Sequence, residues 1–410
     1  MAQHSESSPG GVAAAVELDP RTRPLFDDVF LGGFECSCQK LADGRRLDML
    51  SRTRHDELAR ADYERLRAAG MTACRDGVSW VQSERSASVY DFSRAARMVN
   101  AANETGVDVI WDLMHFGWPD DIDVFSSELP ARFGRYARAF ARWLANETDR
   151  RIMVTPINEM SFLAWAAGDV RCMFPFEAAR GVEIKVQLVR ATIEAIEAIR
   201  DVAPAARFLQ PEPVIHIVPP PENRKIWARV ESDGLLQYQA WDMLAGRVWP
   251  GLGGDPKYLD ILGVNFYPDN QFTPDGETIM RDDVRYRSFS RMLLDVWHRY
   301  GRPMIVSETG AEGEHRAPWL RYVAGQCVAA LDRGCELHGV TLYPVLNHPG
   351  WVDDRYCANG LWDYADANGN READARLSEE LRHQRGRLVV ARSKMLRQRA
   401  DALSGAVATK

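Results

Sequence analysis

Hydrophobic residues in this chain fall into short, nearly continuous runs that alternate with longer amphipathic stretches. A brief apolar run of this kind is typical of a strand that is buried on both faces, as in a parallel sheet. The sequence therefore predicts strands with these approximate bounds: residues 29–34, 71–74, 107–114, 152–157, 207–212, 258–266, 303–308 and 339–346.

The stretches between the runs have helical periodicity. Residues 129–146 place Phe133, Tyr136, Ala137 and Phe140 three or four positions apart, which gives one apolar face. Similar patterns predict helices with these approximate bounds: residues 55–69, 93–105, 181–202, 287–300, 317–333 and 373–403, with a further helix somewhere in 225–246. Strand and helix thus alternate eight times at intervals of roughly 35 to 55 residues, which predicts the α/β fold of a single (β/α)8 TIM barrel.

The pattern also divides the chain. Residues 1–25 are rich in Ser, Gly, Pro and Ala and are expected to be a flexible N-terminal segment. Residues 26–370 form the predicted barrel, and residues 371–410 a C-terminal helical segment that packs on the barrel or extends from it. A doubly wound open sheet is the competing architecture, but Gly32 and Gly33 lie inside the first run and do not follow the spacing of a phosphate-binding loop.

Composition narrows the function. The chain has 410 residues and a formal net charge of −7, without a Lys/Arg-rich run, which argues against a nucleic-acid partner. No lysine ends an apolar run, so a barrel that forms a Schiff base with its substrate is not expected. The seven cysteines contain no C-x-x-C pair, and Cys36 and Cys38 are expected to be buried free thiols on the first strand. With neither a signal peptide nor a membrane span in view, we expect a cytoplasmic protein without a membrane partner.

Two predicted strands end in the same way. The run at 152–157 leads into Asn158 and Glu159, and the run at 303–307 ends at Glu308. The carboxyl ends of barrel strands form the catalytic face of this fold. A single glutamate there is more often half of a salt bridge, but two on one barrel provide the acid and the nucleophile of a retaining glycosidase.

Several motifs in order then show a resemblance. They are residues 30–39 with Gln39 at the end, His115-Phe116-Gly117-Trp118-Pro119, Thr155 to Glu159, Leu259 to Tyr267, and Ser307-Glu308-Thr309-Gly310. Over residues 30–364 the chain resembles the barrel glycosidases of clan A and is most similar to glycoside hydrolase family one, the β-glucosidases and β-galactosidases.

The resemblance implies roles for particular residues. Glu308 would be the nucleophile and Glu159 the acid/base, with Arg75 and Tyr267 beside Glu308. The residues implied in sugar binding are Gln39, His115, Asn158, which would hold the 2-hydroxyl, Asn265, and Trp351, which would form a platform under the ring. Taken singly, Arg75 could equally pair with Asp76, His115 could be a satisfied core residue, and Trp351 could serve packing alone.

The chain also departs from the family pattern. Gly350 stands where the family has a hydroxyl-binding glutamate just before a tryptophan, here Trp351, so the preferred sugar is left open. Met160 replaces the proline that follows the acid/base. The chain is shorter than typical members, which predicts a more open cleft.

The leading expectation is a retaining β-glycosidase that hydrolyses terminal β-glucosides or β-galactosides through a covalent glycosyl-enzyme. A transglycosidase and a non-catalytic sugar-binding homologue are the alternatives. A metal-dependent barrel hydrolase would require a His-x-His motif on the first strand, which is missing from residues 34–38. We therefore expect a carbohydrate as the partner, no metal and no cofactor; no oligomeric state is predicted.

Overall fold

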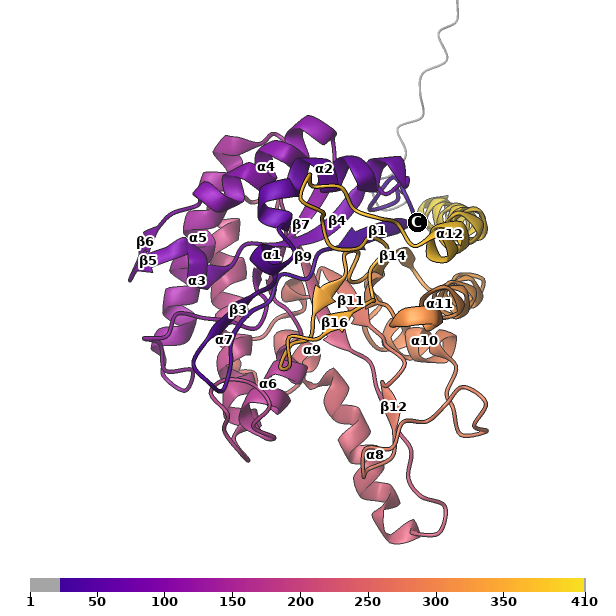
Figure 1. The fold of residues 1–410 in the computed structure, drawn as a ribbon. Helices are drawn as coiled ribbons and strands as arrows, with labels where there is room; N and C mark the ends of the chain where they lie inside the picture. Colours follow the sequence, from indigo (N-terminus) through magenta and orange to yellow (C-terminus); the bar gives the residue numbers. More distant parts are fainter. Residues whose placement is uncertain (1–22, 409–410) are drawn as a thin grey trace, which may run out of the picture.

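The strands close into one barrel. The computed structural model describes residues 23–408, and its central sheet is a closed ring of parallel strands surrounded by helices (Figure 1). The barrel strands are β1 (Phe30–Gly33), β4 (Ala73–Gly77), β7 (Asp108–Met114), β8 (Met153–Ile157), β9 (Arg207–Pro213), β11 (Ile261–Asn265), β13 (Met304–Thr309) and β14 (Leu337–Leu342). They follow one another around the ring in chain order, and β14 pairs with β1 to close it. The predicted (β/α)8 barrel is confirmed.

The larger helices lie where the periodicity predicts them. They are α2 (His55–Ala68), α4 (Ser93–Thr105), α5 (Glu128–Glu147), α7 (Gly181–Arg200), α10 (Phe289–Tyr300), α11 (Arg316–Leu331) and α12 (Ala375–Ala408). The interval 225–246 holds two short helices, α8 (Trp227–Leu235) and α9 (Gln239–Leu244). Figure 1 shows α8 projecting away from the barrel. Helix α6 (Met160–Gly168) was not predicted, and it begins directly after Glu159.

Short strands and helices lie in the loops between the barrel strands and the larger helices. The paired short strands are β2 (Cys38–Lys40) with β3 (Arg46–Asp48), β5 (Glu84–Ser86) with β6 (Val89–Tyr90), β10 (His216–Ile217) with β12 (Gln271–Phe272), and β15 (His348–Pro349) with β16 (Tyr356–Cys357). The short helices α1 (Met49–Arg52) and α3 (Trp80–Ser83) complete the set. The expectation that Cys36 and Cys38 lie on the first strand is wrong. Strand β1 stops at Gly33, and Cys38 begins β2, although both thiols are buried and free as expected.

The interior of the barrel changes character along the strands. A buried apolar layer takes one side chain from each of seven strands, with Phe26 packed against it: Leu31, Ala73, Ile110, Met153, Leu209, Ile261 and Ile305. Residues two positions further on face the same side of a strand. On several strands that next residue is polar and buried, namely Arg75, Asp112, Thr155 and Ser307. The barrel is therefore closed by hydrocarbon at one end and presents polar side chains at the end where the strands terminate.

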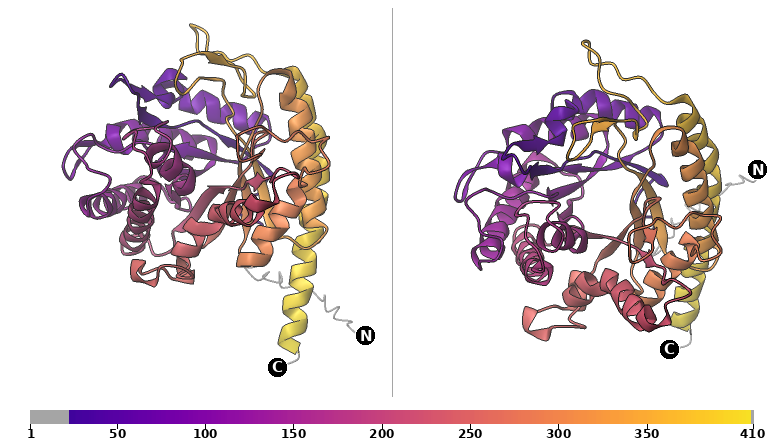
Figure 2. Two further views of the ribbon diagram at one scale, coloured as in Figure 1. Left: turned by 90° about the horizontal axis from the view of Figure 1, so that it is seen from below. Right: turned by 60° about the horizontal axis from the view of Figure 1, so that its bottom comes forward.

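The C-terminal helix braces the opposite end. Helix α12 runs beside α11, and its last turns extend past the barrel (Figure 2). The buried guanidinium of Arg392 donates hydrogen bonds to the carbonyl oxygens of Phe26, Asp28 and His338 at 2.7–3.0 Å, which ties the start of the described chain to α12. Residues 1–22 of the expected flexible segment (residues 1–25) lie outside the described part of the chain. Among residues 23–408, no helix combines the length and apolarity that a membrane crossing requires.

A buried histidine links α2 to the barrel. The two ring nitrogens of His55 each lie 2.8 Å from a carboxylate oxygen, one of Asp62 and one of Asp76, and its ring stacks on Phe34 at 3.7 Å. Burial alone would lower the pKa of His55, but the two carboxylates outweigh it and raise the pKa to about 9. Asp76 directly follows Arg75 on β4, so this ion pair fixes the strand that carries Arg75.

This network predicts a pH-dependent stability. Because the pKa of His55 rises from 6.5 to about 9 on folding, its stabilisation is complete below pH 6.5 and is lost as the pH rises through 9. At about 1.4 kcal/mol per pKa unit, the free energy of unfolding should fall by about 3 kcal/mol from this group over that range. Urea denaturation of the wild type and His55→Gln between pH 6 and 10 measures the difference. The two curves should converge at high pH, whereas exposed His383→Gln should follow the wild type. A difference in unfolding free energy between the wild type and His55→Gln that stays constant with pH would contradict the raised pKa of His55.

Candidate active site

Arg75 lies at the centre of the polar end of the barrel. Its guanidinium is fully buried and donates to Glu308 Oε1 at 2.8 Å, to Asp112 Oδ2 at 2.6 Å and to Asn158 Oδ1 at 2.9 Å. These three partners come from β13, β7 and the end of β8. Arg75 does not pair with Asp76, the alternative left open by the sequence, because Asp76 pairs with His55. One side chain thus joins three strand ends.

Glu308 is held through both carboxylate oxygens. Arg75 donates to Oε1, and the phenol of Tyr267 donates to Oε2 at 2.9 Å. Burial and the negative charge of Glu308 raise the pKa of Tyr267 well above its ordinary value, so the phenol keeps its proton and remains a donor. A guanidinium and a hydroxyl that both point at one carboxylate stabilise its ionised form.

Glu159 has a different environment. Asn265 donates from Nδ2 to Glu159 Oε1 at 2.7 Å, and Ser307 in turn donates to Asn265 Oδ1 at 2.5 Å. Burial, the charge of Glu308 and the charge of Glu212 raise the pKa of Glu159 well above its usual range, despite the bond from Asn265. These surroundings therefore favour the protonated form of Glu159.

The backbone at Glu159 is strained into position. Its φ of +46° is a left-handed conformation that non-glycine residues rarely adopt. It marks the turn between β8 and α6. Both oxygens of the buried Glu212, from β9, accept the N–H of Ser161 in the first turn of α6, at 3.3 and 3.1 Å. Burial raises the pKa of Glu212 to about 7 against the opposing effects of Lys185 and the Ser161 N–H. Glu212 therefore fixes the start of the helix that follows Glu159.

Asn158 and His115 continue the network. Because Arg75 binds the amide oxygen of Asn158, the amide nitrogen faces His115 Nε2, 3.1 Å away. His115 Nδ1 lies 3.2 Å from Asp112 Oδ2 and 3.3 Å from the sulfur of Cys36. The predicted residues Arg75, His115, Asn158, Glu159, Asn265, Tyr267 and Glu308 therefore meet at one rim of the barrel.

Cys36, Asp112 and His115 are close enough to share a metal ion, since their ligand atoms lie within 4.8 Å of one another. The chemistry of the trio does not fit a metal site. Asp112 is already engaged by the cationic guanidinium of Arg75, and burial raises the pKa of the Cys36 thiol well above its normal value. A protonated thiol beside a fixed positive charge is a poor ligand set.

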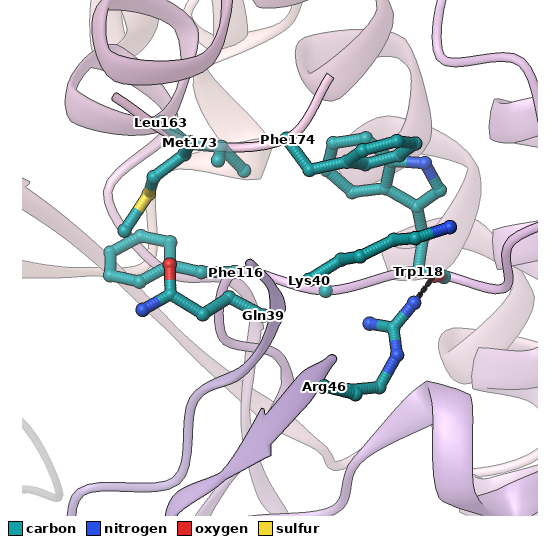
Figure 3. A pocket seen from close by; sticks show the side chains of 9 residues that line it. Gln39, Lys40, Arg46, Phe116, Trp118, Leu163, Met173 and Phe174 are labelled. Atoms are coloured by element: carbon teal, nitrogen blue, oxygen red, sulfur yellow. Dashed lines mark hydrogen bonds between the residues drawn. The ribbon is translucent and has the colours of Figure 1, made fainter. Parts of the chain in front are cut away.

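Gln39 and Trp351 lie on the wall of the site. Gln39 donates from its amide to the backbone oxygen of Trp351 at 3.0 Å, so the two predicted sugar-binding residues are held together. The half-buried indole of Trp351 packs on Phe116 and Phe162, with ring centres 5.6 and 6.1 Å apart. Next to Gln39 is a small pocket that opens to solvent. Its labelled lining in Figure 3 is aromatic and apolar, apart from Gln39, Lys40 and Arg46.

The sequence reasoning missed four residues of the site: Glu35, Asp112, Glu212 and Tyr343. The ring of Tyr343 stacks on His115 at 6.0 Å and lies 5.4 Å from the Arg75 guanidinium. Glu212 had a visible signal, because it is a third carboxylate at the end of a predicted strand. Asp112 lies within its strand, and no sequence pattern distinguishes it from a solvent-facing residue.

Comparison with solved structures identifies proteins of the same fold. The β-glucosidase from Thermotoga maritima in complex with glucoimidazole superposes with a TM-score of 0.72 at 14% identity, covering 89% of this chain and 99% of that chain. The family 1 β-glucosidase from the same organism gives a TM-score of 0.70 at 16% identity, covering 88% and 97% of the two chains. The T. maritima β-glucosidase bound to azafagomine gives 0.70 at 15%, covering 91% and 99%. No known family profile and no curated protein sequence matches the chain.

The electrostatics of the site predict how the proton on Glu159 responds to its neighbours. Glu308→Gln removes the nearest negative charge and should lower the pKa of Glu159. Glu212→Gln should lower it by a smaller amount while keeping an acceptor for Ser161 N–H. Asn265→Ala removes the donor to the ionised form and should raise it. Carbon NMR titration of labelled glutamate measures the three shifts, and shifts of the opposite sign would refute this picture.

Proposed function

We propose that this protein is a retaining β-glycosidase in which Glu308 is the nucleophile and Glu159 the acid/base. The observation that carries the proposal is the contrast between two carboxyl groups at the same rim. Glu308 receives hydrogen bonds from Arg75 and Tyr267, whereas burial and neighbouring charges raise the pKa of Glu159 well above its usual range. Two carboxyl groups in opposite proton states at one pH are what a double-displacement glycosidase requires.

In the first step, Glu308 attacks the anomeric carbon while the bond from that carbon to the leaving oxygen breaks. Glu159 gives its proton to the leaving oxygen, so the alcohol departs neutral. The product is a glycosyl ester on Glu308. Positive charge develops on the sugar ring during this step, and Asn158 is placed to bind the 2-hydroxyl, a contact that strengthens in the transition state.

Formation of the ester on Glu308 changes the electrostatic environment of Glu159. Once Glu308 is esterified, its negative charge no longer opposes the ionised form of Glu159, and the hydrogen bond from Asn265 stabilises that form. Glu159 can then take a proton from water as the water oxygen attacks the anomeric carbon. The bond to Glu308 breaks and its carboxylate returns to Arg75 and Tyr267. The same residue thus serves as acid and then as base.

The substrate we propose is a terminal β-glucoside or β-galactoside. Gln39, His115 and Asn158 supply polar groups for sugar hydroxyls, and the aromatic side chains of Trp351 and Tyr343 supply apolar surfaces for the ring. The T. maritima β-glucosidases of the same fold bind glucoimidazole and azafagomine, which supports a carbohydrate ligand here.

Covalent labelling tests the nucleophile. A 2-deoxy-2-fluoro β-glucosyl donor slows the second step, so the ester should accumulate and peptide mapping should place the added mass on Glu308. Exposed Glu314→Gln, a few residues further along the same loop, should label like the wild type. In Glu308→Ala, azide should restore turnover and yield a glycosyl azide of inverted configuration. An inverted azide formed by a Glu159 variant would exchange the two roles.

Leaving-group dependence tests the acid. Glu159→Gln should lose about 10²–10⁴-fold in kcat/KM on an alkyl glycoside, because the departing alkoxide needs a proton. The loss should be much smaller on a dinitrophenyl glycoside, whose leaving group departs as a stable anion. Equal losses on the two substrates would show that Glu159 is not the proton donor.

A further inference from the structure

One further carboxylate of the site, that of Glu35, has few partners among the described residues. Glu35 follows β1 and is 4% exposed. Its Oε1 accepts the backbone N–H of Ser37 at 3.0 Å, and His115 Nε2 lies 3.8 Å from the same oxygen, beyond hydrogen-bond distance. Within residues 23–408, Oε2 receives no hydrogen bond.

The structural carboxylates of this protein have different surroundings. Buried Asp62 is bonded by His55, Arg65 and Arg371, and buried Asp112 by Arg75 and His115. Buried ionised groups ordinarily have such partners, because leaving one unpaired is costly. Burial alone would raise the pKa of Glu35, but the nearby His115 and His348 and the hydroxyl and N–H of Ser37 outweigh it and lower the pKa. Glu35 is thus an ionised, buried carboxylate with one bonded oxygen.

Glu35 faces the sugar-binding residues. Its negative charge contributes to raising the pKa of both Tyr267 and Tyr343, the two phenols next to Glu308 and Arg75. It extends from the rim between β4 and β14, the neighbours of β1 in the ring. Glu35 Oε1 and His115 Nε2 lie 3.8 Å apart, so a hydroxyl that donates to Glu35 Oε1 lies close to the His115 ring, whose Nε2 faces the amide nitrogen of Asn158.

We propose, on the basis of the glycosidase function above, that Glu35 binds two neighbouring hydroxyl groups of the sugar unit that becomes attached to Glu308. One hydroxyl donates to Glu35 Oε1 close to His115, and the other donates to the free oxygen of Glu35. A carboxylate can accept from two hydroxyls at once, since it has two oxygens and no proton. Glu35 is therefore a specificity-determining residue of the site.

The charge of the site defines the class of sugar. The guanidinium of Arg75 is already bound by the carboxylates of Asp112 and Glu308, and it makes no bond to Glu35. Lys40 and Arg46, on the nearby β2–β3 ribbon, lie 3.3 and 2.5 Å from the carboxylate of Asp120. His115 and His348 already offset the charge of Glu35, so a carboxylate or phosphate of a sugar at that position would bring in a second anion beside the first. The sugar unit is therefore neutral, with free hydroxyls.

Deoxy sugars test this assignment. The substrates are an aryl β-glucoside and its 3-, 4- and 6-deoxy analogues, and the readout is the ratio of kcat/KM between parent and analogue. The wild type should lose about 10- to 100-fold on the analogue that lacks a bound hydroxyl, as for hydrogen bonds to a charged group. In Glu35→Gln and Glu35→Ala this ratio should collapse to a few-fold, while Glu314→Gln keeps it. Unchanged ratios in both Glu35 variants would overturn the proposal.

Two further measurements separate this inference from the proposed function. Labelling of Glu308 in Glu35→Gln shows that the variant is folded and retains its chemistry, so that a changed ratio reports recognition. If the wild type neither labels nor hydrolyses, the hydrolase proposal fails. In that case, saturation-transfer NMR measures the binding of glucose and of 3-, 4- and 6-deoxyglucose. This measurement tests whether Glu35 binds the sugar, independently of any hydrolysis. Glucose binding that weakens in Glu35→Gln supports the inference, and binding that is unaffected refutes it.

Discussion

The site depends on one buried cation. Arg75 has no contact with solvent, and the enclosure of its charge is tolerated because Asp112 and Glu308 lie against it and Asn158 completes its hydrogen bonds. Removing either carboxylate leaves the buried cation with one anionic partner in place of two, and breaking a buried pair typically costs about 3–5 kcal/mol. The guanidinium therefore does more than orient Glu308. It fixes the relative positions of β4, β7, β8 and β13 at the polar end of the barrel.

The pKa and the conformation of Glu159 also depend on its neighbours. Among residues 23–408 no cation bonds its carboxyl group, and burial with the charges of Glu308 and Glu212 raises its pKa. Its left-handed backbone conformation persists because Glu212 anchors the next helix turn and Asn265 holds the side chain. The two glutamates of the pair thus differ through their neighbours alone. The same neighbours explain why a change at Glu308 is felt at Glu159, which is the coupling that a two-step mechanism uses.

The barrel could be read from the sequence because parallel strands are buried on both faces, so each is a continuous apolar run that ends in polar residues. The prediction failed for elements that lack such a contrast between apolar and polar positions. Helix α6 was missed because Leu163, Ala164, Ala166 and Ala167 are all buried and the helix has no clear polar face. The proposed pair, Glu159 and Glu308, was predicted from its position at strand ends and from the resemblance of neighbouring motifs. The partners of Arg75 were only partly foreseen, since hydrogen bonds between distant strands leave no pattern in the chain.

The position of Glu35 also explains a departure in the sequence. Gly350 stands where the related enzymes have a glutamate, and its N–H donates to the Arg355 carbonyl in a tight turn of the β15–β16 ribbon. A Cβ at Gly350 would lie 2.0 Å from Asp353 Oδ1 and 3.2 Å from Arg355 Cγ, so a longer side chain would have to displace both. The ribbon in this conformation does not supply a carboxylate to the sugar. We propose that Glu35 supplies one from the β1 side of the same rim, where His115 and His348 offset its charge. A carboxylate that approaches from a different wall contacts different hydroxyls, so in the proposed site the sugar preference follows from the β1–β2 loop.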